Sequence, residues 1–150
     1  MASGIRLILP PQADASIQAI ADLFTREVAR HGGPTVTCDG SAAGTVVRLE
    51  VRPELGSEAY ALQDGAQGEL LVAGGDARGL LYGLGRLLRE ARMAPESFAP
   101  GIWRGRSAPN KPVRGIYLAT HFHNYYHDAP VAEVERYVEE LALWGYNVVS

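Results

Sequence analysis

Residues 113–150 follow a strand, helix, strand pattern, which sharply restricts the folds open to this chain. Residues 113–120 form an apolar strand, and residues 146–150 begin a second one. Between them, apolar residues recur at three- and four-residue spacing from Val134 to Trp144, in a helix that starts near Pro130. Strands joined by a crossover helix are parallel. A single unit of this kind cannot stand alone, so we expect it to belong to a larger sheet.

The first part of the chain predicts an α+β domain. Its predicted strands are the short apolar runs at residues 5–9, 35–38, 45–51, 59–63 and 69–73. Two amphipathic helices are predicted at residues 14–30 and 77–92, the second capped by Asp76. Because consecutive short strands favour antiparallel pairing, we expect a mainly antiparallel sheet with two helices on one face. The isolated acidic residues Glu50, Glu54 and Glu58 are expected at the solvated surface.

Residues 95–112 are rich in Pro, Gly, Ser and Arg, which is typical of a connection rather than an element. We therefore expect an α+β domain at 1–95, a linker at 96–112 and the strand–helix unit at 113–150. In that unit the strand at Val113 lacks the neighbouring strands of a larger sheet, and the apolar stripe of the helix is only partly covered by other elements. Residues 113–150 are thus expected to pair with another copy as a homo-oligomer, or to be poorly ordered.

Composition excludes several classes of function. The 150 residues are 47% hydrophobic, enough for one proper core, with a net charge of -3 and no basic block for phosphates, so nucleic acid is not an expected partner. Cys38 is the single cysteine, so neither a disulfide framework nor a thiolate zinc site is expected. No apolar stretch approaches a membrane span, and no secretory leader is visible, which gives a cytoplasmic location by default.

Two motifs stand out, GLLYGLGRLL at residues 79–88 and VRGIYL at residues 113–118, and they resemble segments of the glycoside hydrolases of family 20 and, more distantly, of α-glucuronidases. Residues 79–88 (GLLYGLGRLL) resemble a helix of the N-terminal domain that precedes the catalytic barrel in these enzymes. Residues 113–118 (VRGIYL) resemble the first barrel strand. The resemblance implies an N-terminal domain with the fold called zincin-like, followed by the first βα(β) unit of a truncated TIM barrel. The chain has no HExxH helix, so that fold name implies no metal here.

The resemblance also implies site residues. Arg114 matches an arginine that grips sugar hydroxyls, a task suited to the fork of a guanidinium, and His123 matches a histidine just after the strand. The family's aspartate is replaced by Ala119 and an arginine by Phe122, which departs from the N-acetylhexosamine pattern. The catalytic carboxylates of the family belong to a later strand, beyond Ser150. We therefore expect no catalytic residue in this chain, and a fragment without activity of its own.

The run from His121 to Tyr126 leaves two functions open. His121 and His123 would point to one side if the strand extended that far, and two imidazoles could begin a zinc site of an amidohydrolase-like barrel. Alternatively, His121, His123 and Tyr125 contact carbohydrate, with Tyr125 offering an aromatic face to a sugar ring. We favour the sugar-binding interpretation, with no metal or cofactor. A third hypothesis makes the chain a non-enzymatic scaffold or binding module.

Overall fold

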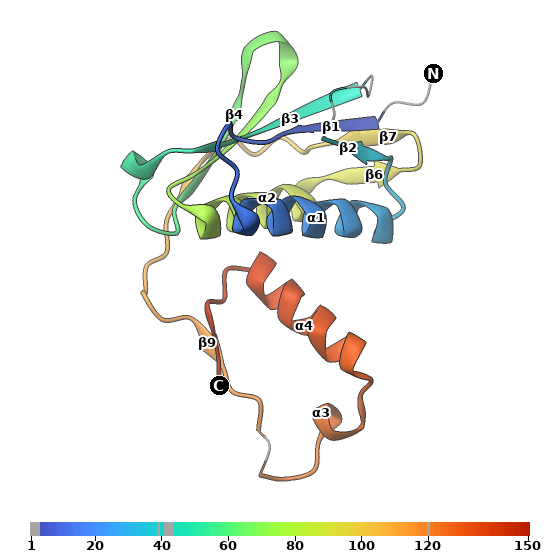
Figure 1. Cartoon of the computed structure of the whole chain (residues 1–150), viewed down its shortest axis with the longest axis vertical. Coiled ribbons are helices and arrows are strands. Elements are labelled where there is room, and N and C mark those ends of the chain that lie inside the picture. Colours follow the sequence, from blue (N-terminus) through green and yellow to red (C-terminus); the bar gives the residue numbers. More distant parts are fainter. Residues whose placement is uncertain (1–3, 39, 41–43, 120) are drawn as a thin grey trace.

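The computed structural model describes residues 4–38, 40, 44–119 and 121–150. Within these residues, the largest sheet has six strands in the order β2-β1-β3-β5-β4-β8. The strands are β1 (Gly4–Ile8), β2 (Val36–Thr37), β3 (Gly44–Val51), β4 (Tyr60–Asp64), β5 (Leu70–Gly74) and β8 (Gly105–Ser107). Helices α1 (Ala15–Arg30) and α2 (Ala77–Glu90) both lie under one face of this sheet (Figure 1). Two short 3-10 turns, η1 (Pro53–Leu55) and η2 (Ala66–Gly68), flank β4.

The expectation of a mainly antiparallel sheet is wrong, because the sheet is mixed. Strand β1 pairs in parallel with both β2 and β3, and β3 pairs in parallel with β5. Only β4 is antiparallel to its neighbours, β5 and β8. The reason is the strand order: β5 is inserted between β3 and β4, so β3 and β4 follow one another in sequence without being neighbours. The hairpin between β4 and β5 is the part that sequence proximity predicted correctly.

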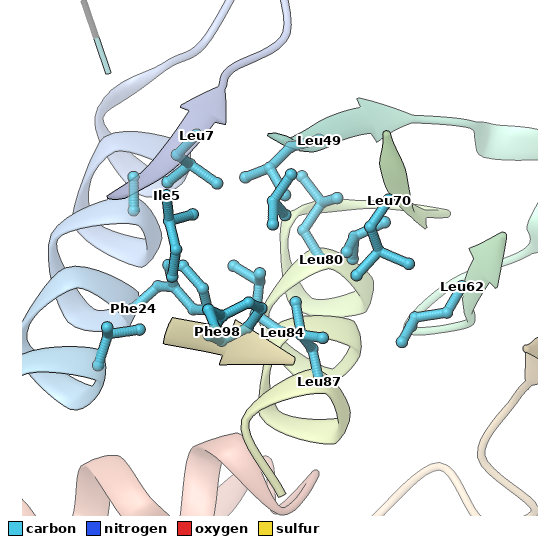
Figure 2. Packing of buried hydrophobic residues seen from close by; sticks show 14 of the residues in the cluster. Ile5, Leu7, Phe24, Leu49, Leu62, Leu70, Leu80, Leu84, Leu87 and Phe98 are labelled. Carbon is cyan, nitrogen blue, oxygen red and sulfur yellow. The ribbon is translucent and has the colours of Figure 1, made fainter. Parts of the chain in front are cut away.

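The core lies between the sheet and the two helices (Figure 2). The alternation of β1 and β3 sends Ile5, Leu7, Val47 and Leu49 toward the helices, where each is at most 1% exposed. The other half of the core comes from the apolar stripes of the helices: Phe24 and Val28 of α1, and Leu80, Leu84 and Leu87 of α2. Both helices were predicted, and the bounds agree to within two residues.

Both long helices begin at an aspartate that caps the first turn. The side chain of Asp14 accepts a hydrogen bond from the Ile17 amide at 2.9 Å, and that of Asp76 accepts one from the Gly79 amide at 2.8 Å. These bonds satisfy amides that have no partner within the helix. The predicted capping role of Asp76 is confirmed.

Residues 96–112 contain elements, contrary to the expectation of a plain connection. Strand β7 (Ser97–Ala99) forms a hairpin with β6 (Arg92–Ala94), which lies just before this range, and β8 extends the main sheet beside β4. The isolated aromatic residues explain this result, since Phe98 joins the core at 8% exposure and Trp103 packs on Tyr60 with ring centroids 6.1 Å apart. The division into domains at these positions stays a prediction.

The C-terminal unit consists of β9 (Gly115–Ile116), α3 (Tyr125–Asp128), α4 (Val131–Leu143) and β10 (Val148–Val149). Strands β9 and β10 are parallel, as predicted, and form a sheet separate from the main one. Backbone hydrogen bonds extend the pairing, from the Asn147 amide to the Arg114 carbonyl at one end and from the Leu118 amide to the Ser150 carbonyl at the other. Helix α4 lies on the side of α1 and α2 that faces away from the sheet (Figure 1).

Among the described residues, no helix combines the length and apolar character needed to cross a membrane.

Candidate functional site

The predicted sugar-binding residues His121, His123 and Tyr125 follow the C-terminal end of β9, in the segment that leads to α4. The strand does not extend to them: β9 ends at Ile116, and its last interstrand hydrogen bond is donated by the Leu118 amide. The two histidines therefore occupy irregular backbone. The period-two argument that placed them on one side does not apply there.

The two histidines have different partners. His121 Nδ1 shares a 2.8 Å hydrogen bond with the Tyr117 hydroxyl, and the two rings stack with centroids 5.9 Å apart. His123 Nε2 lies 2.7 Å from a carboxylate oxygen of Asp128. Within the part of the chain that the structure describes, no three His, Cys, Asp or Glu side chains are grouped around a common point where a metal ion would bind. The donor set for the metal-dependent alternative is therefore not assembled among these residues.

Tyr125 is exposed and oriented by α4. Its hydroxyl donates a 2.8 Å hydrogen bond to Glu133, and this bond raises the pKa of Tyr125. Together with Tyr117 and Phe122, which are 61% and 55% exposed, Tyr125 makes this segment rich in accessible aromatic rings. Exposed aromatic faces with polar partners at their edges are compatible with binding the C–H face of a sugar. The sugar-binding roles of His121, His123 and Tyr125 stay predictions.

Arg114 directly precedes β9, and therefore lies at the opposite end of this strand from the aromatic segment. Its Nε donates to the Gly145 carbonyl at 2.7 Å and its Nη1 to the Lys111 carbonyl at 2.7 Å. Its Nη2 donates to Glu58 Oε2 at 2.8 Å and lies 3.3 Å from the Tyr82 hydroxyl. Each nitrogen of the guanidinium thus has a partner within the chain. Its predicted contact with sugar stays a prediction, and the structure does not bring it together with His121, His123 and Tyr125.

Glu58 is the centre of a polar cluster that the sequence did not indicate. It is 8% exposed, although it was expected at the surface. Its carboxylate accepts hydrogen bonds from Arg78, Arg114 and Asn147 at 2.8–3.4 Å, and it lies 3.4 Å from the Tyr82 hydroxyl. We call these five residues the Glu58 cluster. The sequence gave no local signal for it, because Arg114 and Asn147 are 56 and 89 positions away from Glu58.

The electrostatics of the cluster keep Glu58 ionised. Burial alone would raise the pKa of Glu58, but hydrogen bonds from Arg114, Asn147 and Arg78 and the charge of Arg114 outweigh it, so the pKa is lowered. Burial also raises the pKa of Tyr82, and the neighbouring Glu58 charge raises it further. A carboxylate held ionised by two guanidinium groups is a poor general acid near neutral pH. The arrangement suits a fixed contact between two parts of the chain.

A second contact joins α2 to the end of α4. Arg89 donates a 2.8 Å hydrogen bond to the Leu143 carbonyl, and its guanidinium lies 4.2 Å from the centroid of the Trp144 ring. The backbones approach so closely that a Cβ added to Gly85 would lie 2.0 Å from the Leu143 oxygen. The glycine-rich sequence of α2 is thereby explained, since a Cβ on Gly79 would likewise lie 2.2 Å from the Ala59 oxygen.

No known family model matches the sequence, and no curated protein matches it. Solved structures do match. A family GH20 exo-β-N-acetylglucosaminidase from Vibrio harveyi, solved with N-acetylglucosamine, has a TM-score of 0.66 at 19% identity, over 98% of this chain and 21% of the other. A β-N-acetylhexosaminidase from Bacteroides fragilis has a TM-score of 0.70 at 14% identity, over 99% of this chain and 29% of the other.

A family GH115 4-O-methyl-α-glucuronidase is similar as well, with a TM-score of 0.64 at 19% identity, over 99% of this chain and 25% of the other. This chain spans less than a third of the length of each of these three enzymes. Because the aligned region includes nearly all of this chain, the likeness extends over both the α+β part and the β9–α4–β10 unit. The chain therefore has the fold of a segment shared by GH20 hexosaminidases and a GH115 glucuronidase.

Proposed function

We propose that this chain is the N-terminal part of a glycoside hydrolase and that residues 113–150 are the first βα(β) unit of its TIM barrel. One observation carries the proposal: 97–99% of the chain superposes on each of several GH20 enzymes and a GH115 enzyme. The parallel β9–β10 pair, joined by α4, supports the barrel part. On this proposal Tyr117, His121, His123 and Tyr125 lie at the sugar-binding mouth, since barrel active sites are built at the C-terminal ends of strands.

The chain alone lacks the machinery for bond cleavage on this proposal. Glycosidic hydrolysis requires two groups placed on either side of one bond. In this chain Glu58 is ionised and bound to arginines, and Asp128 and Glu133 are paired with His123 and Tyr125. We infer that the catalytic carboxylates come from strands that follow Ser150. The α+β domain then supports the barrel from the end opposite its mouth.

The test is hydrolysis of aryl glycosides by the protein extended beyond Ser150 to a complete barrel. We expect release of nitrophenol from an aryl N-acetyl-β-glucosaminide or an aryl α-glucuronide, unchanged by a metal chelator, and no release by residues 1–150. In the extended protein, the substitution Tyr125→Ala should raise KM. The control is Tyr146→Ala, which removes a tyrosine that is not among the four residues at the proposed mouth and should leave KM unchanged. No hydrolysis of any aryl glycoside by a folded, complete barrel would contradict the proposal.

The metal-dependent alternative predicts a different result in the same material. An amidohydrolase-like barrel that uses His121 and His123 would hold stoichiometric zinc and lose activity with the chelator. In the described residues, His121 and His123 instead bind Tyr117 and Asp128, and this observation favours the glycosidase. Elemental analysis of the extended protein separates the two.

A further inference from the structure

We propose that Glu58 is a docking point that fixes strands β9 and β10 against the α+β domain and against each other, and that Arg114 serves this contact. The docking point is occupied by this chain's own Arg114 and Asn147, at the starts of the two strands. This role of Glu58 is the same whether or not the protein is a glycosidase.

The carboxylate of Glu58 binds the starts of both strands. Arg114 directly precedes β9, and Asn147 directly precedes β10. The Arg114 guanidinium reaches Glu58 Oε2 at 2.8 Å, and the Asn147 side-chain amide reaches Glu58 Oε1 at 3.1 Å. Because the two strands start at these residues, a carboxylate that holds both of them sets the register at which β9 and β10 pair.

Asn147 uses both the oxygen and the nitrogen of its side-chain amide in this contact. Its side-chain oxygen accepts a hydrogen bond from the Arg114 amide at 2.9 Å, and its side-chain nitrogen donates to the Pro112 carbonyl at 2.8 Å as well as to Glu58. The backbone amide of Asn147 donates to the Arg114 carbonyl. The end of the linker, the start of β9 and the start of β10 therefore meet at Asn147, and Glu58 ties this meeting point to the α+β domain.

The backbone of Glu58 adopts an unfavourable conformation. Its φ is 58°, in the left-handed region that disfavours residues with a Cβ. Glycine would adopt this conformation without strain, yet the position holds a glutamate. Asp76 supports the turn, since its carboxylate, which caps α2, also accepts hydrogen bonds from the Glu58 amide at 3.0 Å and the Ser57 hydroxyl at 3.0 Å. A strained backbone at Glu58 is consistent with a carboxylate that is required at the position where it binds Arg114 and Asn147.

Hydrogen exchange of the full chain tests the proposal, read at the amides of Leu118, Asn147 and Ser150, which donate to the opposite strand of the β9–β10 pair. We expect Glu58→Gln, which keeps the shape and removes the charge, to accelerate exchange at these amides at least tenfold. The amides of β3 and β5 should change less than twofold. Asn147→Ala should accelerate exchange at the same three amides. Because Asn147 also binds Arg114 and Pro112, and Arg114 binds Glu58 without it, the double variant should exceed either single variant but fall short of the two single effects combined.

Two controls separate the docking role from general effects of charge. Glu54→Gln changes the same functional group on the exposed turn before Glu58 and should leave all of these amides unchanged. Arg78→Gln removes a Glu58 partner that belongs to α2 and not to the strand pair, so its effect should be small. The proposal is overturned if Glu58→Gln leaves the three amides within twofold of the wild type. The proposal is equally overturned if exchange at the amides of β3 and β5 accelerates as much as exchange in the β9–β10 pair. It is also overturned if the effects of Glu58→Gln and Asn147→Ala on exchange are fully additive in free energy.

Gly85→Ala provides an independent measurement, because it acts on the second contact only. A methyl group there collides with the Leu143 carbonyl, so α4 must shift away from α2. If Glu58 fixes the strand pair by itself, exchange should accelerate in α4 while Asn147 and Ser150 stay protected. Loss of protection at Asn147 and Ser150 equal to that in α4 would show that the α2–α4 contact, not Glu58, holds the strands, and would overturn the proposal.

Discussion

At the scale of single residues, Glu58 and Arg114 depend on each other, and neither environment can be read from its own neighbours in sequence. Glu58 follows a 3-10 turn and Arg114 follows a proline-containing linker, and both segments look like ordinary surface loops. Burial of the carboxylate is tolerated because two guanidinium groups and an amide replace its water. Removing Arg114, the less exposed of the two guanidinium groups, leaves a buried charge without compensation, so we expect a large effect from its substitution. Arg78 is 63% exposed, and its substitution is expected to have a small effect.

The lowered pKa of Glu58 predicts a loss of stability in acid. A carboxylate whose pKa is lower in the folded than in the unfolded state binds fewer protons when folded. Its contribution is therefore complete above its ordinary value of about 4.5 and is lost as the pH falls from there through the lowered pKa. Urea unfolding between neutral pH and pH 3 should show a steeper decline for the wild type than for Glu58→Gln. Parallel pH profiles of the two proteins would contradict this expectation.

The sequence predicted some residue roles correctly and missed others, and the difference is distance along the chain. Asp76 could be assigned as a cap because the amide it binds lies three positions away, in Gly79. The partners of Glu58 lie up to 89 positions away, so no local pattern reveals them. Arg114 is limited in the same way, because most of its partners are distant in sequence. The family resemblance predicts a sugar-binding role for it, and the structure adds four hydrogen bonds within the chain.

At the scale of elements, the long helices were predictable, whereas the pairing of most strands in the main sheet was not. The stripes and caps of α1 and α2 are properties of consecutive residues, so their bounds follow from periodicity. The partners of a strand depend on how distant segments meet. Strand β5 is buried along its whole length because β3 and β4 lie on its two sides, one parallel and one antiparallel, and α2 covers it. Its continuous apolar run is typical of such a central strand, whereas its direction relative to β3 has no signal in the sequence.

The two capping aspartates allow a matched comparison of elements. Asp14 bonds one amide of α1, whereas Asp76 bonds the α2 amide of Gly79 and also holds Ser57 and the Glu58 backbone. Replacing a cap by alanine costs about 1 kcal/mol, and each further hydrogen bond adds about 1 kcal/mol. We therefore expect Asp76→Ala to reduce the free energy of unfolding by roughly 2–3 kcal/mol and Asp14→Ala by about 1 kcal/mol. Chemical denaturation of both variants measures this difference, and equal losses would contradict it.

At the scale of the whole molecule, apolar exposure is uneven. The α+β part buries its apolar residues between the sheet and two helices, whereas most of the exposed large apolar side chains among the described residues belong to the C-terminal unit. They include Val113, Tyr117, Val131, Trp144, Val148 and Val149. Strands β9 and β10 also form a sheet of two, so each has an unpaired edge within the part of the chain that is described. Concentrated apolar surface and open strand edges both favour association.

We therefore predict that residues 1–150 self-associate through 113–150 and that one charge on β10 prevents it. Val148 in β10 and Val51 in β3 are both 40% exposed, so the two valines offer the same substitution on the two parts of the molecule. Sedimentation velocity at high protein concentration should show the wild type and Val51→Lys as dimers or larger species, and Val148→Lys as a monomer, because a lysine on an edge strand opposes pairing. A folded wild-type monomer at that concentration would contradict the prediction. If Val51→Lys and Val148→Lys dissociated the dimer equally, the interface would not be specific to residues 113–150.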